Sequence, residues 1–93
     1  MNIAYVRVST IEPNKSIQVE GLKKYNIDRW FIDNVSAKDT NRPKLNDMIA
    51  FARDGDTIYI LSLDRLARNI KDLSDIVKKL QLNGIHLVIA IQQ

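Results

Sequence analysis

The sequence predicts an α/β domain: a parallel sheet of about four strands with flanking helices, in three Rossmann-like layers. Two observations favour this fold. Short runs that are apolar on consecutive positions recur along the chain, which is typical of parallel strands buried on both faces. Segments with apolar residues at helical spacing lie between these runs and join them through short turns. Alternating strands and helices of this kind form right-handed βαβ units.

The composition indicates one ordinary globular domain. The chain has 93 residues, of which 45% are hydrophobic and 27% charged, so a packed core is expected. It contains no cysteine, which excludes disulfides and thiolate metal sites. The longest apolar run, residues 87–91, is far shorter than the ~20 residues that span a bilayer. No signal peptide precedes the first strand, so we expect a cytoplasmic protein without membrane contact.

The first half of the chain begins with a strand that runs from Ile3 to the Ser9-Thr10 pair. Ser16 can cap a helix, and a short strand is expected at residues 30–32. A polar stretch, residues 33–41, shows no periodicity and is expected to be a loop.

The second half starts with a helix over residues 43–53, because Pro43 suits a first helical turn. Its core-facing stripe consists of Leu45, Met48, Ile49 and Ala52. A third strand is expected at residues 57–63 and a fourth at residues 85–91. One continuous helix between them, capped by Asn83-Gly84, would carry a stripe of Leu66, Ile70, Leu73, Val77 and Leu80.

Arg7 interrupts the first apolar run, where an unpaired charge would be expensive to bury. Alternation along the strand places Arg7 and Ser9 on one face at its carboxyl end. In open parallel sheets this edge is where ligands and catalytic groups gather. Taken alone, the pair also fits a buried arginine that pairs with an acid, followed by a helix-capping serine.

Further arginines are expected at the same edge. Asp64, Arg65 and Arg68 follow the third strand, and Arg65 and Arg68, three residues apart, would share a helix face. Arg42, at the end of the polar loop, could swing over the edge. Asp64 can balance one arginine and Asp33 another, which leaves net positive charge. The sequence therefore predicts a phosphate-binding edge built around a hydroxyl.

Four motifs carry a family resemblance: Tyr5-Val6-Arg7-Val8-Ser9-Thr10, Asn41-Arg42-Pro43, Gly55-Asp56 and Leu63-Asp64-Arg65-Leu66-Ala67-Arg68. Together, in this order, they resemble the catalytic domain of serine recombinases, the resolvase/invertase family. The resemblance covers essentially the whole chain, residues 1–93.

The resemblance implies site-specific DNA recombination. Ser9 would attack a DNA phosphodiester and form a 5′-phosphoserine link, and no metal or other cofactor would be needed. The scissile phosphate would be bound by four arginines, Arg7, Arg42, Arg65 and Arg68. Asp64 would orient arginines or assist proton transfer. Gln18 matches a polar residue near the family's active site and is a further candidate, although glutamine is also common on helix surfaces.

The implied partners are double-stranded DNA and further copies of the chain, as a dimer and as a synaptic tetramer. The host would be a transposon or phage element, and resolution, inversion and DNA integration all remain open. The family's dimerisation helix and DNA-binding domain would follow residue 93. We therefore expect residues 1–93 to be a fragment that folds without cutting DNA.

The sequence departs from the family at Phe51, where members often carry a basic residue. Arg53 is the nearest basic substitute, but Phe51 and Arg53 flank opposite sides of the helical stripe. Arg53 is therefore a candidate for long-range assistance only if its side chain reaches around the end of the helix.

Three other functions remain open on the sequence. One is a phosphate-binding α/β regulatory module without catalysis. Another is a hydrolytic phosphodiesterase, which would normally need a cluster of metal ligands that the sequence does not mark. The third is a catalytically degenerate family member, with Phe51 as its sign.

Overall fold

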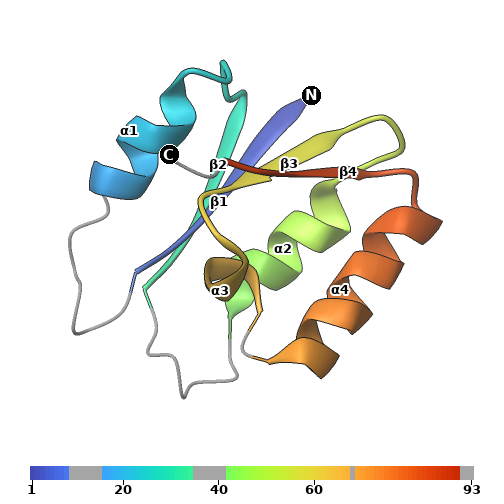
Figure 1. The fold of residues 1–93 in the computed structure, drawn as a ribbon. Coiled ribbons are helices and arrows are strands. Elements are labelled where there is room, and N and C mark those ends of the chain that lie inside the picture. The colour runs from blue at the N-terminus through green and yellow to red at the C-terminus, as the bar shows by residue number, and fades with distance from the viewer. Residues whose placement is uncertain (9–15, 35–41, 68, 91–93) are drawn as a thin grey trace.

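The computed structural model describes residues 1–8, 16–34, 42–67 and 69–90 (Figure 1); of Ser16, Ile17, Asp64 and Arg65 it describes the backbone only. Strands and helices alternate through most of this chain. In chain order they are β1 (Asn2–Val8), α1 (Ser16–Lys23), β2 (Arg29–Asn34), α2 (Pro43–Phe51), β3 (Thr57–Ile60), α3 (Leu63–Leu66), α4 (Ile70–Leu82) and β4 (His86–Ile89).

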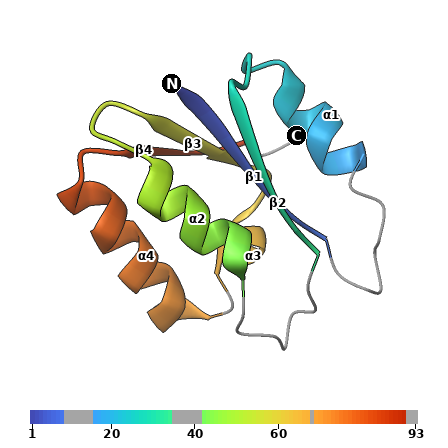
Figure 2. The same ribbon diagram turned by 180° about the vertical axis from the view of Figure 1, so that it is seen from behind.

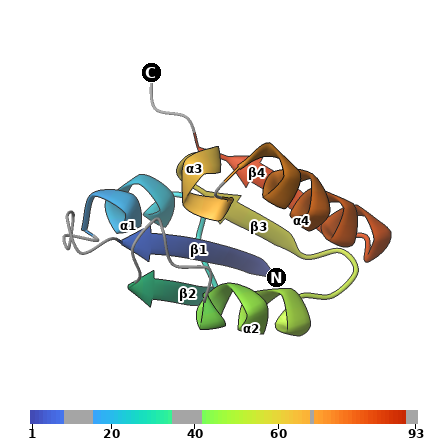
Figure 3. The same cartoon turned by 90° about the horizontal axis from the view of Figure 1, so that it is seen from below.

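The strands form one parallel sheet in the order β2-β1-β3-β4, which confirms the predicted fold class. Figure 3 shows the strands side by side in this order. Helix α1 covers one face, while α2 and α4 cover the other (Figures 1 and 2). In the register, Ile3 of the central strand β1 faces Arg29 of β2 and Ile58 of β3.

Strand β1 is buried on both faces, as the consecutive apolar residues predict. Ile3 and Tyr5 pack into a core cluster with α2 and α4, together with Phe31 and Met48. The alternate residues, such as Val6, pack into a second cluster on the α1 side. Because side chains alternate along a strand, Arg7 belongs to the same face as Ile3 and Tyr5.

The start of α2 is fixed by Pro43 and by Asp33, the penultimate residue of β2. The Asp33 carboxylate accepts hydrogen bonds from the backbone N–H groups of Lys44 and Leu45, each at 3.0 Å. A carboxylate at this position satisfies helix donors that otherwise lack partners. The hydroxyl of Tyr5 donates a third hydrogen bond to Asp33, at 2.8 Å. Asp33 is predicted to lie in the polar loop, but it is a buried residue of β2.

Several boundaries differ from the prediction. Strand β3 ends at Ile60 rather than at 63, β4 covers residues 86–89 rather than 85–91, and α2 ends at Phe51 rather than at 53. Strand β2 is longer than predicted, from Arg29 to Asn34.

The predicted continuous helix after β3 is wrong, because the chain leaves helical geometry between α3 and α4. Ala67 is extended, with φ −132° and ψ 152°, and Asn69 is extended as well. The Asn69 side chain accepts a hydrogen bond of 2.8 Å from the backbone N–H of Asp72 and so starts a new helix. Ile70 is 86% exposed instead of lying in the core, and Ile76 joins Leu80 as a buried residue.

No helix within the described ranges is long and apolar enough to cross a membrane.

Candidate active-site edge

The carboxyl ends of β1 and β2 and the start of α2 meet at one edge of the sheet. Arg7 and Asp33 are register partners in β1 and β2, and Asp33 caps α2. Helix α3 follows β3 at the same edge. The backbone therefore brings Arg7, Arg42 and the segment from Asp64 to the same edge of the sheet.

Not every predicted site residue can be placed. Ser9 and Arg68 lie outside the described residues. Asp64 and Arg65 are placed by backbone only, in α3.

Arg7 is a buried cation near the end of the central strand, with 7% of the residue exposed. Its carbonyl oxygen accepts a hydrogen bond of 2.8 Å from Nε2 of Gln18, which is itself buried in α1. Gln18 therefore does not lie on the helix surface, and it ties α1 to the backbone just before Ser9. The Oε1 atom of Gln18 is buried and has no hydrogen-bond partner among the described residues.

Tyr5 and Asp33 form a buried polar pair beneath this edge. Burial raises the pKa of the Tyr5 hydroxyl well above its ordinary value, and the hydrogen bond to Asp33 and the charge of Asp33 raise it further. The positive charges of Arg42 and Arg7 act on Tyr5 in the opposite direction, so both cations lie in its electrostatic neighbourhood. Charge balance alone predicts Asp33 as a counter-charge, whereas its hydrogen bonds to Tyr5 and to α2 depend on tertiary contacts.

Arg42 occupies the N-cap position of α2 and is buried, with 4% of the residue exposed. Its Nη1 atom donates to the carbonyl oxygen of Leu66 at 2.5 Å, and its Nη2 atom donates to Oδ2 of Asp72 at 2.6 Å. The side chain thus joins α2 to α3 and α4 rather than lying open above the edge.

The predicted shared face of Arg65 and Arg68 does not follow from this geometry. Residues three apart lie on one face only within a continuous helix. Helix α3 ends at Leu66, and Ala67 is extended. In the sequence, Arg65 precedes the last residue of α3, and Arg68 follows Ala67.

Phe51 and Arg53 lie at the opposite edge of the sheet. Helix α2 runs from the carboxyl edge, where Asp33 caps it, back towards the start of β3. The backbone N–H of Arg53 donates to Asp56, which also binds the amino group of Met1. Met1 precedes β1, and the six steps between the seven residues of this strand, at ~3.3 Å each, put about 20 Å between the two edges. This position does not fit the suggested catalytic role of Arg53.

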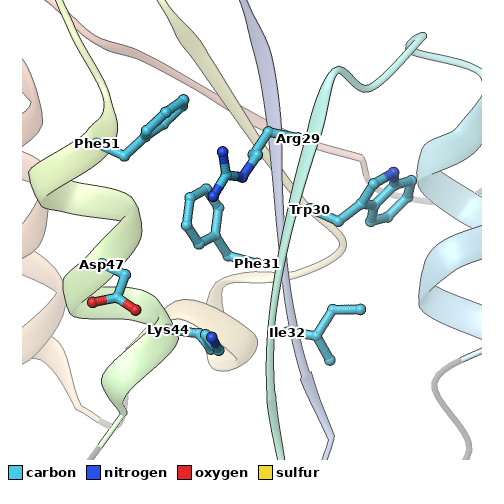
Figure 4. A pocket seen from close by; sticks show the side chains of 7 residues that line it. All are labelled: Arg29, Trp30, Phe31, Ile32, Lys44, Asp47 and Phe51. Carbon is cyan, nitrogen blue, oxygen red and sulfur yellow. The ribbon is translucent and has the colours of Figure 1, made fainter.

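Phe51 has a packing role at that opposite edge. Its ring lies 5.7 Å from that of Phe31, and the Arg29 guanidinium lies 4.8 Å from the Phe51 ring centroid and 5.2 Å from that of Phe31. Figure 4 shows these three side chains together between β2 and α2. They line a groove of about 440 Å³ that also includes Lys44 and Asp47. A lysine at position 51 would therefore lie in this cluster.

Within the part of the chain that the structure describes, no group of three or more His, Cys, Asp or Glu residues could hold a metal ion.

The fold is a parallel α/β domain in which two buried arginines, Arg7 and Arg42, lie at the carboxyl edge of the sheet. Residues 2–93 match the family described as "Resolvase, N terminal domain", and the chain belongs to this family. This confirms the resemblance drawn from the four motifs.

Named relatives agree with this assignment. The chain is 49% identical over 85 residues to the transposon Tn21 resolvase of Escherichia coli, and 40% identical over 84 residues to the DNA-invertase hin of Salmonella typhimurium strain LT2. The matched parts cover 91% and 90% of this chain and 44% of each relative, so the chain spans less than half the length of these proteins.

A solved structure shares the fold. It is the C-terminal catalytic domain of ISC1926 TnpA, an IS607-like serine recombinase, with a TM-score of 0.83 at 20% identity. The match covers 99% of this chain and 71% of that domain.

Proposed function

We propose that this chain is the catalytic domain of a site-specific DNA recombinase that cleaves and rejoins strands through a phosphoserine at Ser9. The observation that carries the proposal is the buried cation Arg7 at the end of the central strand, two residues before Ser9, at the edge where Asp33 and Arg42 also lie. The resolvase and invertase names of relatives at 40–49% identity support the same reaction.

In the proposed reaction, the Ser9 Oγ attacks the phosphorus of a DNA phosphodiester. The bond from Ser9 Oγ to phosphorus forms, the bond from phosphorus to the 3′ oxygen breaks, and a proton passes from the serine to the departing 3′-hydroxyl. Rejoining is the reverse attack of a 3′-hydroxyl on the phosphoserine. The phosphodiester energy is kept in the covalent intermediate, so no high-energy cofactor is consumed.

The proposed transition state is stabilised by arginines in place of metal ions. Arg7, Arg42, Arg65 and Arg68 would share the charge of the phosphoryl oxygens. Asp64 would orient these arginines or assist the proton transfer. Gln18 would hold the strand end in place, because its amide donates to the carbonyl of Arg7.

The proposed partners are double-stranded DNA and further copies of the protein, as a dimer and then as a tetramer around two DNA sites. Relatives named as transposon resolvases and DNA-invertases support a role in a mobile element or an inversion system in the cytoplasm. In this proposal residues 1–93 supply the chemistry, and regions beyond them supply most of the DNA affinity and the assembly surface.

The test is covalent trapping. Protein carrying this domain together with its remaining regions is incubated with plasmid that contains its recombination site, in EDTA, and stopped with detergent. A protein–DNA adduct that maps to Ser9 by peptide sequencing is expected, and Ser9→Ala should abolish it. Ser74→Ala is the matched control, because Ser74 is exposed on α4. An adduct at another residue, or adduct formation that requires a divalent metal, would contradict the proposal.

A further inference from the structure

Arg42 cannot bind a phosphate group from the position that it occupies in this structure. It is 4% exposed, and two of its nitrogens donate to Leu66 and Asp72. A phosphodiester on the DNA backbone needs exposed donors at the sheet edge. We infer that Asp72 restrains Arg42, and that a phosphate must displace the Asp72 carboxylate before Arg42 can bind it. The inference rests on the proposed function, because it assigns Arg42 to the phosphate.

The two partners of this ion pair differ in how well they tolerate separation. The side chain of Arg42 is 5% exposed and that of Asp72 is 24% exposed. Asp72 lies in the first turn of α4, where the helix dipole favours a negative charge. In contrast, an arginine that stays buried without an anion strongly destabilises the folded state. Arg42 is therefore expected to exchange one anion for another, while Asp72 keeps the favourable field of the helix N-terminus.

The contact with Asp72 leaves part of the guanidinium unused. One carboxylate oxygen accepts from Nη2, while the Nε atom of Arg42 is buried and has no hydrogen-bond partner among the described residues. A phosphate oxyanion that accepts from two donors of the guanidinium fork would satisfy the side chain better. A phosphate can therefore compete with the Asp72 carboxylate for Arg42.

The restraint connects Arg42 to the segment that carries the other arginines. Leu66 is the last residue of α3, and Asp72 lies just beyond the start of α4. The link between them is not helical, since Ala67 and Asn69 are both extended. A shift of α3 against α4 would change both contacts of Arg42 together. Arg42 also borders a groove of about 220 Å³ between α2 and α4, which Asp72 and Asp75 line as well.

The experiment compares two variants of the 93-residue chain that lose the same charge. Asp72→Asn removes the restraint, whereas Asp75→Asn removes an exposed carboxylate from the same groove that makes no described contact with Arg42. Each chain is titrated with inorganic phosphate at constant ionic strength, and the Nε–H signal of Arg42 is followed by NMR. We expect Asp72→Asn to tighten phosphate binding on the order of tenfold over Asp75→Asn, because apparent affinity rises with the fraction of competent side chain.

Three results would overturn the inference: an equal gain in both variants, which would indicate general electrostatics, weaker binding in Asp72→Asn, or no response of Arg42 in that variant. If Asp72→Asn fails to fold, the same NMR titration of the wild-type chain tests the inference. Saturating phosphate should then shift the signals of the Asp72 carboxyl carbon and of the Arg42 Nε–H together, and unchanged signals would contradict the restraint. The phosphate titration involves no strand cleavage, so a failure of the proposed Ser9 chemistry is detected separately, in the covalent trapping.

Discussion

The Tyr5 hydroxyl donates a 2.8 Å hydrogen bond to Oδ2 of Asp33, and this bond joins the central strand to the carboxylate that caps α2. Both residues are buried, at 0% and 2% exposure. The pair thus fixes where α2 begins, and with it the position of Arg42 at the candidate site.

Tyr5→Phe is expected to destabilise the chain by about 1–3 kcal/mol, because it leaves a buried carboxylate with one partner fewer. The loss should depend on pH. Burial raises the folded-state pKa of Tyr5 above its ordinary value of 10.0, so its contribution is complete below pH 10 and is lost as pH rises further. Urea unfolding between pH 7 and 11 should therefore show a steeper alkaline loss for wild type than for Tyr5→Phe. Parallel curves would contradict this.

Gly84→Ala should cost more than Gly55→Ala, although both glycines have positive φ, +68° and +91°. A left-handed alanine costs roughly 1–2 kcal/mol at either site. At Gly84 a Cβ would also collide with the Asp54 carboxylate, an exposed side chain that must rotate away, whereas at Gly55 it would meet open space; the extra cost at Gly84 is therefore small. Thermal unfolding of the two variants measures the difference. In an Asp54→Ala background the cost at Gly84 should fall to that at Gly55, and an unchanged cost would exclude the collision.

Asp56→Asn should remove stability that wild type has at neutral pH. The backbone N–H of Arg53 and then the amino group of Met1 hold the pKa of Asp56 below its ordinary value of 3.8. A lowered folded-state pKa contributes stability above pH 3.8 and loses it as pH falls through the folded value. Wild type and Asp56→Asn should therefore converge in unfolding midpoint only below the folded-state pKa of Asp56, which lies under 3.8. Asp47→Asn, at an exposed position of α2, is the control.

The sheet and its central strand were predictable because local patterns determine them. Residues 3–8 are apolar on both faces apart from Arg7, and Pro43 marks the start of α2. Asp33 as a cap was not predictable, since it lies ten residues before Pro43 in the sequence and meets α2 only through the tertiary fold. The break after α3 was missed because Leu66 and Ile70 keep helical spacing across it. Asn69, a preferred capping residue, was the available signal.

The candidate site was predicted in part, in the same physical terms. Alternation along β1 placed Arg7 correctly near the carboxyl edge. The engagement of Arg42 by Asp72 depends on a contact between residues 30 apart, which no local pattern encodes. The opposite location of Arg53 could have been inferred, because a helix that connects parallel strands runs antiparallel to them and ends at their starting edge. The spacing of the apolar residues indicates only the buried face of that helix and not its direction.

Arg53→Ala is expected to leave DNA cleavage unchanged within about twofold. The reason is distance, since about 20 Å of β1 separates the two edges of the sheet. The measurement is the rate of adduct formation in the trapping assay, with the unfolding free energy of each variant determined in parallel.

Phe51→Lys should lower stability, because it removes the ring that packs against Phe31 and stacks on Arg29. Phe51→Leu is its matched control and should retain more of the packing. A gain in cleavage by Phe51→Lys, or a large loss in Arg53→Ala at unchanged stability, would show that this edge reaches the substrate through another subunit or a different arrangement of α2.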